Sequence, residues 1–480
     1  MNAFYFGVFS LYLIGILCIG IWGWQRITDQ SDFATAGQGL PLFLVTTSLL
    51  ATYISALSII GGVGYASEHG WAFLSLFSFG VMAGSLFLSI TAKRWHDSGV
   101  NSVSELLERE YGPGSQHVRT VTSISIVFSF AVILVAQLFG IGFILEGIVG
   151  IPMPVAILAV GSIITAYTVL GGMVSVARTD FIQVAVMGTG IVILVVALGR
   201  LVLGDPDVSF TQEASHMTVY GGETPNNRTM FATFLAMGFG TAVHPYFVQR
   251  LLSAKDVRAA RLAPALTAVG AFLIYVSLSI IGIIGALYLP EHVGDQMAPA
   301  IIENLMTGVL GAFALLALLA VVQSTTDSLL HVIGVYISQD IYGPYFLDDP
   351  SERQMLRWSR IFTAVFGILC VLFATTQAAF GQVGLIALFA TYAWGVTGAS
   401  LFVVVVAAFY WDRLTWQAGV SAVLAGFLGR LGGGVLEDVG YVDFDTTGLA
   451  VLASVLVFLA VNYLADTDET RRKGVPSPTD

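Results

Sequence analysis

Ser324-Thr325-Thr326-Asp327-Ser328 places four hydroxyls and a carboxylate inside an apolar run that extends from Gly308 to Ile337. A charged Asp at the centre of a membrane helix costs about 2.5–3.5 kcal/mol on insertion scales. Such residues persist where they face a helix bundle or a watery cavity and meet a partner. Hard oxygen donors without Cys or His favour an alkali or alkaline-earth cation over a transition metal. The stretch therefore predicts a membrane helix that holds a small cation.

The rest of the chain also has the composition of a membrane protein. Hydrophobic residues make up 56% of the 480 residues and charged residues only 11%, whereas soluble domains carry about a quarter charged residues. The net charge of −11 indicates no nucleic-acid partner. The sequence contains no Walker loop, so ATP-driven pumping is not predicted. Composition thus predicts a protein whose main partner is the lipid bilayer.

Each membrane crossing needs about 20 apolar residues, and the apolar runs predict thirteen spans. Basic residues fall in or next to loops on one side, Arg250 among them, with the exceptions of Arg200, Arg228 and Arg430. The positive-inside rule makes that side cytoplasmic. We therefore expect a multi-pass protein of the plasma membrane, with its N-terminus outside and its C-terminus in the cytoplasm. The predicted spans cover residues 4–24, 41–65, 72–92, 120–147, 153–170, 180–203, 229–249, 264–289, 305–337, 358–378, 383–408, 416–435 and 447–465.

The second predicted span combines central hydroxyl groups with glycines. It reads Ser48-Leu-Leu-Ala-Thr-Tyr-Ile-Ser-Ala-Leu-Ser58, and Gly61, Gly62 and Gly64 follow. Glycine weakens a helix, and a broken span can offer carbonyl oxygens to a cation and an amide end to an anion. Small residues also let helices approach closely, so the glycines alone leave both interpretations open. Together with the hydroxyls of 324–328, they favour a cation site beside a broken helix.

Four segments, in this order, carry a resemblance to a known family. They are Asp32 to Gly37, Ala51 to Gly64, the Gly-Gly turn leading to Thr-Asp-x-x-Gln at Gly171 to Gln183, and Ser324 to Leu330. They resemble the sodium/solute symporter family, which carries sugars, proline, pantothenate, iodide and short monocarboxylates. The second segment is most similar to the pantothenate and monocarboxylate branch.

The resemblance implies a fold and a division of the chain. The implied fold is all-α and integral to the membrane, with about 13 transmembrane helices and a leucine-transporter-type core of two inverted five-helix repeats. Residues 1–40 would form the first span and a cytoplasmic linker, 41–410 the ten-helix transport core, and 411–465 two C-terminal spans. The charged tail, residues 466–480, is predicted to be disordered and cytoplasmic.

The resemblance also implies a sodium (Na+) site between the second and ninth spans. Its ligands would be three backbone carbonyls and two hydroxyls, those of Ala51, Ile54, Val321, Ser324 and Thr325.

Four further residues match positions with a role in coupling among relatives. Asp327 and Ser328 lie where some relatives build a second cation site, and Tyr167 and Asp180 lie near the inward exit of sodium. Structural roles compete with these: Asp180 can stabilise a helix N-terminus, and Tyr167 can belong to an interfacial aromatic belt.

Candidate substrate-pocket residues are polar or aromatic and lie in the same or neighbouring spans: Tyr53, Ser55, Ser58, Gln323 and Trp394. Aromatic core packing is an equally good role for Trp394, and Gln323 can simply bond a neighbouring helix. Tyr53 and Leu57 stand where proline-specific relatives carry Asp and Trp, which argues against proline.

The sequence therefore predicts a sodium-coupled symporter, not an enzyme, that takes up a small organic solute by alternating access. The expected substrate is a carboxylate, pantothenate or a short monocarboxylate. A symporter for proline or another amino acid is the alternative, and a membrane sensor of a solute is a candidate from a different class.

Overall fold

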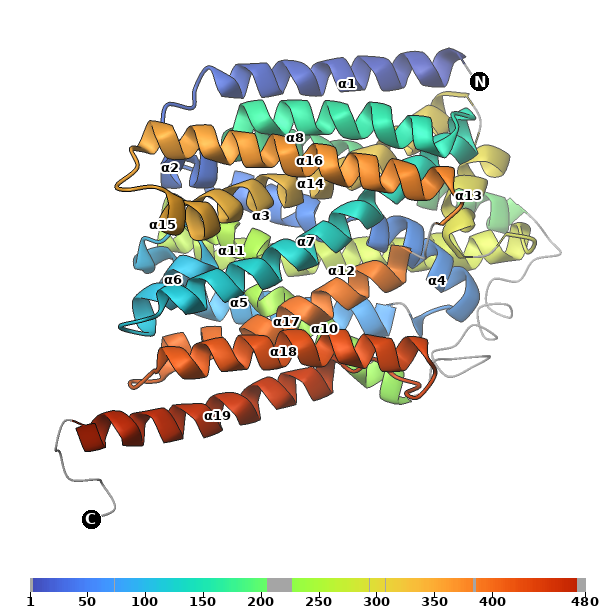
Figure 1. Cartoon of the computed structure of the whole chain (residues 1–480). Coiled ribbons are helices and arrows are strands. Elements are labelled where there is room, and N and C mark those ends of the chain that lie inside the picture. The colour runs from blue at the N-terminus through green and yellow to red at the C-terminus, as the bar shows by residue number, and fades with distance from the viewer. Residues whose placement is uncertain are drawn as a thin grey trace.

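The computed structural model describes residues 3–72, 74–204, 227–292, 294–306, 308–382 and 386–472. These residues form helices and, apart from one isolated bridge between Leu40 and Ala254, no β-structure. Figure 1 shows α1 along one edge of the bundle and α19 along the opposite edge, with the other helices between them. The predicted all-α class is confirmed.

Helices make up both halves of the chain in the described residues. The first half of the chain contains α1 (Ala3–Trp24), α2 (Gln30–Thr35), α3 (Leu42–Tyr53), the π-helix η2 (Leu57–Gly61), α4 (Gly62–His69), α5 (Phe79–Ser98), α6 (Val103–Glu110), α7 (Gln116–Ile144) and α8 (Met153–Gly204). The second half contains α10 (Asn227–Val243), α11 (Pro245–Leu252), α12 (Val257–Tyr288), α13 (Met297–Leu305), α14 (Gly308–Tyr336), the π-helix η6 (Ile337–Tyr342), α15 (Gly343–Phe346), α16 (Glu352–Ala379), α17 (Ile386–Tyr410), α18 (Trp416–Asp438) and α19 (Thr447–Arg472).

Ten of the described helices are long and apolar enough to cross a membrane, or eleven when the bent pair α3 and α4 counts as one span. The 52 residues of α8 would extend about 78 Å at 1.5 Å per residue, far more than one bilayer core of about 30 Å. They cover two predicted spans. α5 overlaps the third predicted span from residue 79 to residue 92 and continues six residues beyond its predicted end. α1 begins at one end of the bundle and α19 ends at the other (Figure 1), as an odd number of crossings requires.

Gly172 divides α8 into its two parts. Its backbone angles, φ 47° and ψ −158°, lie in a region that residues with a Cβ atom rarely adopt. A Cβ atom at this position would also lie 2.5 Å from the Phe33 ring and 2.9 Å from the Phe33 carbonyl oxygen. Gly172 therefore allows both the break in α8 and the close approach of α2.

Gly172→Ala is accordingly expected to destabilise the fold, because the strained backbone costs about 1–3 kcal/mol and the methyl group overlaps Phe33. The expected result is a lower melting temperature of the purified protein in detergent, followed by tryptophan fluorescence. Gly188→Ala is the matched control, since a Cβ atom there, also in α8, meets nothing within 4 Å. Equal melting temperatures for the two variants would contradict this assignment.

The predicted break in the second span is present, but it precedes the glycines. α3 ends at Tyr53, Ile54 is extended (φ −91°, ψ 116°), and α3 and the following helical segment are bent by 53°. A Cβ atom at Gly64 would lie 2.3 Å from the carbonyl oxygen of Gly294. Gly64 therefore serves close packing of two backbones, and the break itself comes from residues 54–56.

The seventh predicted span is broken as well, between α10 and α11. His244 is extended (φ −62°, ψ 123°) and Pro245 opens α11. Proline lacks an N–H and disfavours helical geometry in the preceding residue, which accounts for the break. The rings of Tyr53 and Phe247 stack at 4.0 Å between centroids, so the two broken spans touch beside their breaks.

The C-terminal spans α18 and α19 follow the predicted core. α19 continues to Arg472, past residue 465, where the sequence predicted the last span to end. The last eight residues of the predicted tail, 473–480, lie outside the described residues. The division of the chain into four regions stays a prediction.

Candidate functional site

The hydroxyls of α14 meet the end of α3. Ser324 Oγ lies 3.0 Å from the carbonyl oxygen of Ala51 and 2.8 Å from that of Val321. Thr325 Oγ1 lies 3.3 Å from the carbonyl oxygen of Ile54. All five residues are buried. The structure thus brings together the five residues that the sequence predicted as sodium ligands.

The break in the second span leaves backbone N–H and C=O groups without partners inside the helix. A side chain of α7 forms a hydrogen bond with one of them. Because α3 stops at Tyr53, carbonyl oxygens of its last turn lack the N–H groups that a continuous helix would supply. The amide N–H of Ala56, beyond the break, donates to Gln137 Oε1 at 2.9 Å. Gln137, which lies in α7, thereby stabilises the broken conformation of the second span.

The donor set is suited to a small monovalent cation. It consists of three carbonyl and two hydroxyl oxygens, without sulfur or nitrogen, which matches the ligand preference of hard cations. It contains no carboxylate, so the set itself carries no formal charge to balance a divalent ion. Ala51, Ile54, Val321, Ser324 and Thr325 are the residues that would hold sodium.

Asp327 faces the first half of α8. Its Oδ2 accepts a hydrogen bond of 2.6 Å from the Tyr167 hydroxyl, which in turn accepts one of 3.1 Å from Gln323 Nε2. Ser328 Oγ lies 3.4 Å from Asp327 Oδ1. Tyr167 is fully buried, which excludes the interfacial-belt alternative. Two residues predicted for different roles, Tyr167 and Asp327, are direct partners.

Asp180 belongs to a second polar group that includes a buried arginine. Its Oδ2 accepts a hydrogen bond of 2.5 Å from Ser48 Oγ and lies 3.5 Å from Arg250 Nη2, with both side chains fully buried. Arg250 also donates to Ser328 Oγ. Asp180 lies within α8, eight residues after the break at Gly172, so it does not stabilise a helix start as the alternative supposed.

Sequence reasoning missed Arg250, because the distribution of basic residues assigns it to the loops of the cytoplasmic side. It is the sixth residue of the eight-residue helix α11 and is 0% exposed. The available signal was its position five residues after Pro245, with apolar residues at 247–248 and 251–252 on either side. At the end of a span, an arginine at the surface and a buried arginine can lie only one helical turn apart. Hydropathy does not distinguish these two positions.

The candidate substrate residues divide into two groups. Tyr53 and Trp394 both pack against Phe247, with ring centroids 4.0 and 5.7 Å away. Ser58 Oγ lies 3.2 Å from the Tyr53 carbonyl oxygen, and Ser55 is buried in the break itself. Gln323 instead bonds Tyr167. Four of the five candidates therefore gather at the breaks, and Gln323 belongs to the Asp327 group.

Three further polar side chains near the breaks were not predicted for the pocket. Among the described residues, the two ring nitrogens of His244, Gln137 Nε2 and Thr241 Oγ1 are buried without a hydrogen-bond partner. The His244 ring lies 5.0 Å from both Phe130 and Trp394. Buried polar atoms are normally satisfied, so these groups are available to a ligand.

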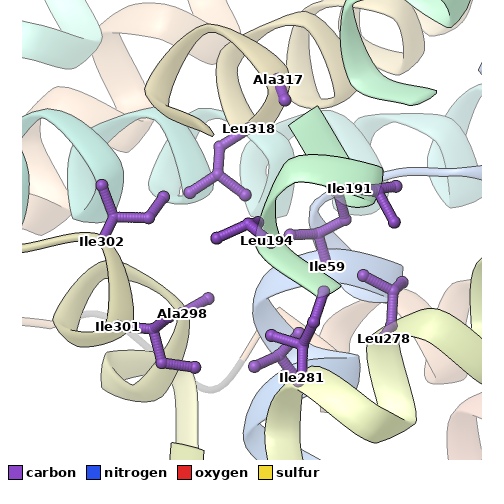
Figure 2. Close-up of a pocket in the computed structure, with 11 residues that line it drawn as sticks. Ile59, Ile191, Leu194, Leu278, Ile281, Ala298, Ile301, Ile302, Ala317 and Leu318 are labelled. Carbon is purple, nitrogen blue, oxygen red and sulfur yellow. The ribbon is translucent and has the colours of Figure 1, made fainter. Parts of the chain in front are cut away.

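An apolar cavity lies farther along the broken span. It measures about 10 Å³ and is lined by Ile, Val, Leu and Ala side chains of η2, α4, α8, α12, α13 and α14. Figure 2 shows the labelled side chains as carbon only. A space of this size holds at most about one water, and its lining offers no hydrogen bonds. It is a packing defect rather than a solute site.

The sequence of this chain matches a known family over most of its length. Residues 33–426 match the Sodium:solute symporter family. The chain belongs to this family. The osmoregulated proline transporter OpuE of Bacillus subtilis is 21% identical over 437 residues, which cover 87% of this chain and 86% of OpuE. Membership implies transport coupled to sodium and agrees with the prediction of a transporter rather than an enzyme.

Solved structures of transporters share the fold. A Na+-coupled sialic acid symporter aligns with a TM-score of 0.82 at 19% identity, covering 96% of this chain and 98% of that chain. The transporter MhsT in complex with L-phenylalanine aligns with a TM-score of 0.55 at 12% identity, covering 87% and 98%. The predicted leucine-transporter-type fold is confirmed.

Proposed function

We propose that this protein takes up a small organic carboxylate, pantothenate or a short monocarboxylate, together with sodium by alternating access. The observation that carries the sodium part is the meeting of the Ser324 and Thr325 hydroxyls with the carbonyl oxygens of Ala51 and Ile54. These groups belong to α14, to the last turn of α3 and to Ile54 at the start of the break in the second span. A cation bound between them would link the two elements, so its loss would free them to separate.

The sodium would leave toward the cytoplasm past Asp180 and Tyr167. Ser48, which bonds Asp180, precedes Ala51 by three residues on α3, and Ser328, which bonds Arg250, follows Ser324 by one turn on α14. Both helices continue in that direction to ends that carry the predicted cytoplasmic loops. We infer the corresponding orientation, with the N-terminus outside and the C-terminus in the cytoplasm of a cell bounded by this plasma membrane.

The chemistry of the groups at the breaks supports a carboxylate as substrate. The Gln137 amide, the Thr241 hydroxyl and a neutral His244 ring can each donate a hydrogen bond, and none of these donors has an acceptor among the described residues. A carboxylate accepts several such bonds. An amino acid would also need acceptors for its ammonium group, and the carbonyl oxygen of Tyr53 already lies 3.3 Å from the Tyr275 hydroxyl and 3.2 Å from Ser58 Oγ.

Proline or another amino acid is the second candidate, and the similarity to OpuE favours it. An identity of 21% over 437 residues is too low to carry a substrate over, so the two candidates need a direct test. Proteoliposomes with an inward sodium gradient should accumulate labelled pantothenate or short monocarboxylates and leave proline outside. Accumulation of proline, without any response to carboxylates lacking an amine, would establish the alternative. Absence of sodium-driven uptake of any solute would favour a sensor.

Sodium and the carboxylate are expected to bind cooperatively. A bound sodium would supply positive charge close to the break in the second span, where an anionic group is expected to bind. We expect the carboxylate to bind at least about tenfold more weakly when choline replaces sodium, which corresponds to about 1.4 kcal/mol of coupling. The carboxylate must tighten sodium binding by the same factor. Calorimetry in detergent measures both effects, and equal carboxylate affinity with and without sodium would contradict the mechanism.

A further inference from the structure

Arg250 is a fully buried guanidinium group that joins four helices. It lies in α11 and contacts Ser48 of α3 through Nε at 3.1 Å, Asp180 of α8 through Nη2 at 3.5 Å, and Ser328 of α14 through Nη2. Its Nη1 donates to the Tyr246 carbonyl oxygen of its own helix at 3.0 Å. An arginine inside a membrane protein is expensive and marks ion or substrate pathways.

The ion pair between Arg250 and Asp180 is loose. Strong arginine–carboxylate pairs have two parallel bonds of about 2.7–2.9 Å, whereas a single Asp180 oxygen lies 3.5 Å from Arg250. The other carboxylate oxygen, Asp180 Oδ1, is buried and has no hydrogen-bond partner among the described residues. The carboxylate therefore keeps one oxygen for another positively charged group.

The Arg250 group lies one helical turn from the proposed sodium ligands. On α14, Ser328 Oγ donates to the Ser324 carbonyl oxygen at 2.8 Å. On α3, Thr52 Oγ1 donates to the Ser48 carbonyl oxygen at 2.7 Å, and Thr52 follows Ala51 directly. A cation that moves from the Ser324 hydroxyl toward the cytoplasmic end of α14 meets Asp180 and Arg250 next.

The helix α2 covers this group from the side of the predicted cytoplasmic loops. His331, one turn after Ser328, bonds the Phe33 carbonyl oxygen through Nε2 at 2.7 Å, and Gln249 Nε2 donates to the Ala34 carbonyl oxygen at 2.9 Å. Arg250 and Asp180 are thus enclosed in this conformation. Sodium on this route has to interact with Asp180 before the cover opens.

We propose that Arg250 is a tethered cation that exchanges with sodium at Asp180. This exchange rests on the proposed sodium route, and it has two steps. While sodium lies among the oxygens of Ala51, Ile54, Val321, Ser324 and Thr325, the guanidinium neutralises Asp180. When sodium moves onto Asp180, the guanidinium withdraws to Ser328 and the Tyr246 carbonyl, and its return to Asp180 expels sodium. Arg250 is a positioning residue of the transport cycle that prevents sodium from staying bound to Asp180.

Arg250→Gln removes the tethered charge and keeps hydrogen-bonding capacity. With radioactive sodium as the probe and purified full-length protein in detergent, we expect the dissociation constant for sodium to fall at least about tenfold, equal to about 1.4 kcal/mol. Sodium dissociation after dilution should slow in the same variant, because nothing displaces the ion from Asp180. Arg250→Lys, which keeps the charge, should stay within about threefold of the wild type, about 0.65 kcal/mol.

A second pair of variants keeps the proposal testable if Arg250→Gln alone does not fold. Asp180→Asn leaves the guanidinium uncompensated and should weaken sodium binding, whereas Asp180→Asn with Arg250→Gln should recover it. No recovery of sodium binding in a folded double variant would contradict the exchange. Sodium affinity that is unchanged or weaker in folded Arg250→Gln, or dissociation as fast as in the wild type, would overturn the exchange. Wild-type protein that binds no sodium would overturn the proposed function instead.

Discussion

Replacing Ser324 and Thr325 together by alanine is expected to raise the sodium concentration for half-maximal uptake at least about a hundredfold. Each lost hydroxyl removes one of five proposed ligands, and an unmet polar partner costs about 1–3 kcal/mol. Two such losses at the middle of this range exceed the 2.7 kcal/mol or so that corresponds to a hundredfold change. Each single variant should give about a tenfold increase. The measurement is uptake into proteoliposomes as a function of external sodium.

Thr326→Ala is the matched control for the double variant. Thr326 lies in the same turn of α14 and is buried, but its hydroxyl donates to the Val322 carbonyl oxygen of its own helix at 2.6 Å. Its loss should leave the sodium dependence within about threefold of the wild type, about 0.65 kcal/mol. The sodium assignment would be wrong if Ser324→Ala and Thr325→Ala both resembled this control.

The residues proposed to hold sodium could be predicted from sequence because their chemistry conflicts with their surroundings. Hydroxyls in an apolar helix need partners, and the resemblance to the family supplied the partner helix. The structure then gave the contacts of Ser324 with Ala51 and of Thr325 with Ile54. Polar residues at membrane depth carry more information about tertiary structure than apolar residues do, since they have fewer acceptable neighbours.

The position of the break and the role of Arg250 could not be predicted in the same way. Glycines suggested a break near Gly61, yet Gly64 packs against Gly294 and the helix ends at Tyr53. The amide of Ala56 is satisfied by Gln137, 81 positions away. A contact of this kind decides where a span breaks, and no local pattern in the sequence reports it. The burial of Arg250 depends likewise on Ser48, Asp180 and Ser328, which come from three other helices.

The residues of the candidate substrate region could be predicted from the sequence only in part. Aromatic residues at the breaks were recognisable, and Tyr53 and Trp394 do meet at Phe247. His244 was visible as the residue before Pro245, but its unsatisfied nitrogens depend on the surrounding Phe130 and Trp394 rings. A histidine in a chain can equally be a bonded core residue, as His331 is through its contact with Phe33. Only the packing around a histidine distinguishes a bonded core residue from one that is available to a ligand.

Asp327→Ala is expected to lower the stability of the protein by about 1–3 kcal/mol, the cost of leaving a buried hydrogen-bond donor without its acceptor. The Tyr167 hydroxyl, which donates to Asp327 Oδ2 at 2.6 Å, would lose its acceptor, and Ser328 would lose a neighbour at 3.4 Å. The melting temperature in detergent should fall by several degrees. Asp327→Asn should melt close to the wild type, because its amide oxygen can accept the Tyr167 hydrogen bond.

The same Asn variant decides between pairing and ion coupling at Asp327. If Asp327 mainly holds Tyr167 and Ser328 in place, the charge moved per transported substrate molecule should be the same in Asp327→Asn as in the wild type. If Asp327 and Ser328 form a second cation site, or if Asp327 carries a proton, loss of the carboxylate must change that ratio. We expect the ratio to be unchanged, because both oxygens of Asp327 already face hydroxyl groups of the protein. Currents and labelled uptake recorded on the same proteoliposomes measure it, and a change of about one elementary charge per cycle would assign Asp327 to the second cation after all.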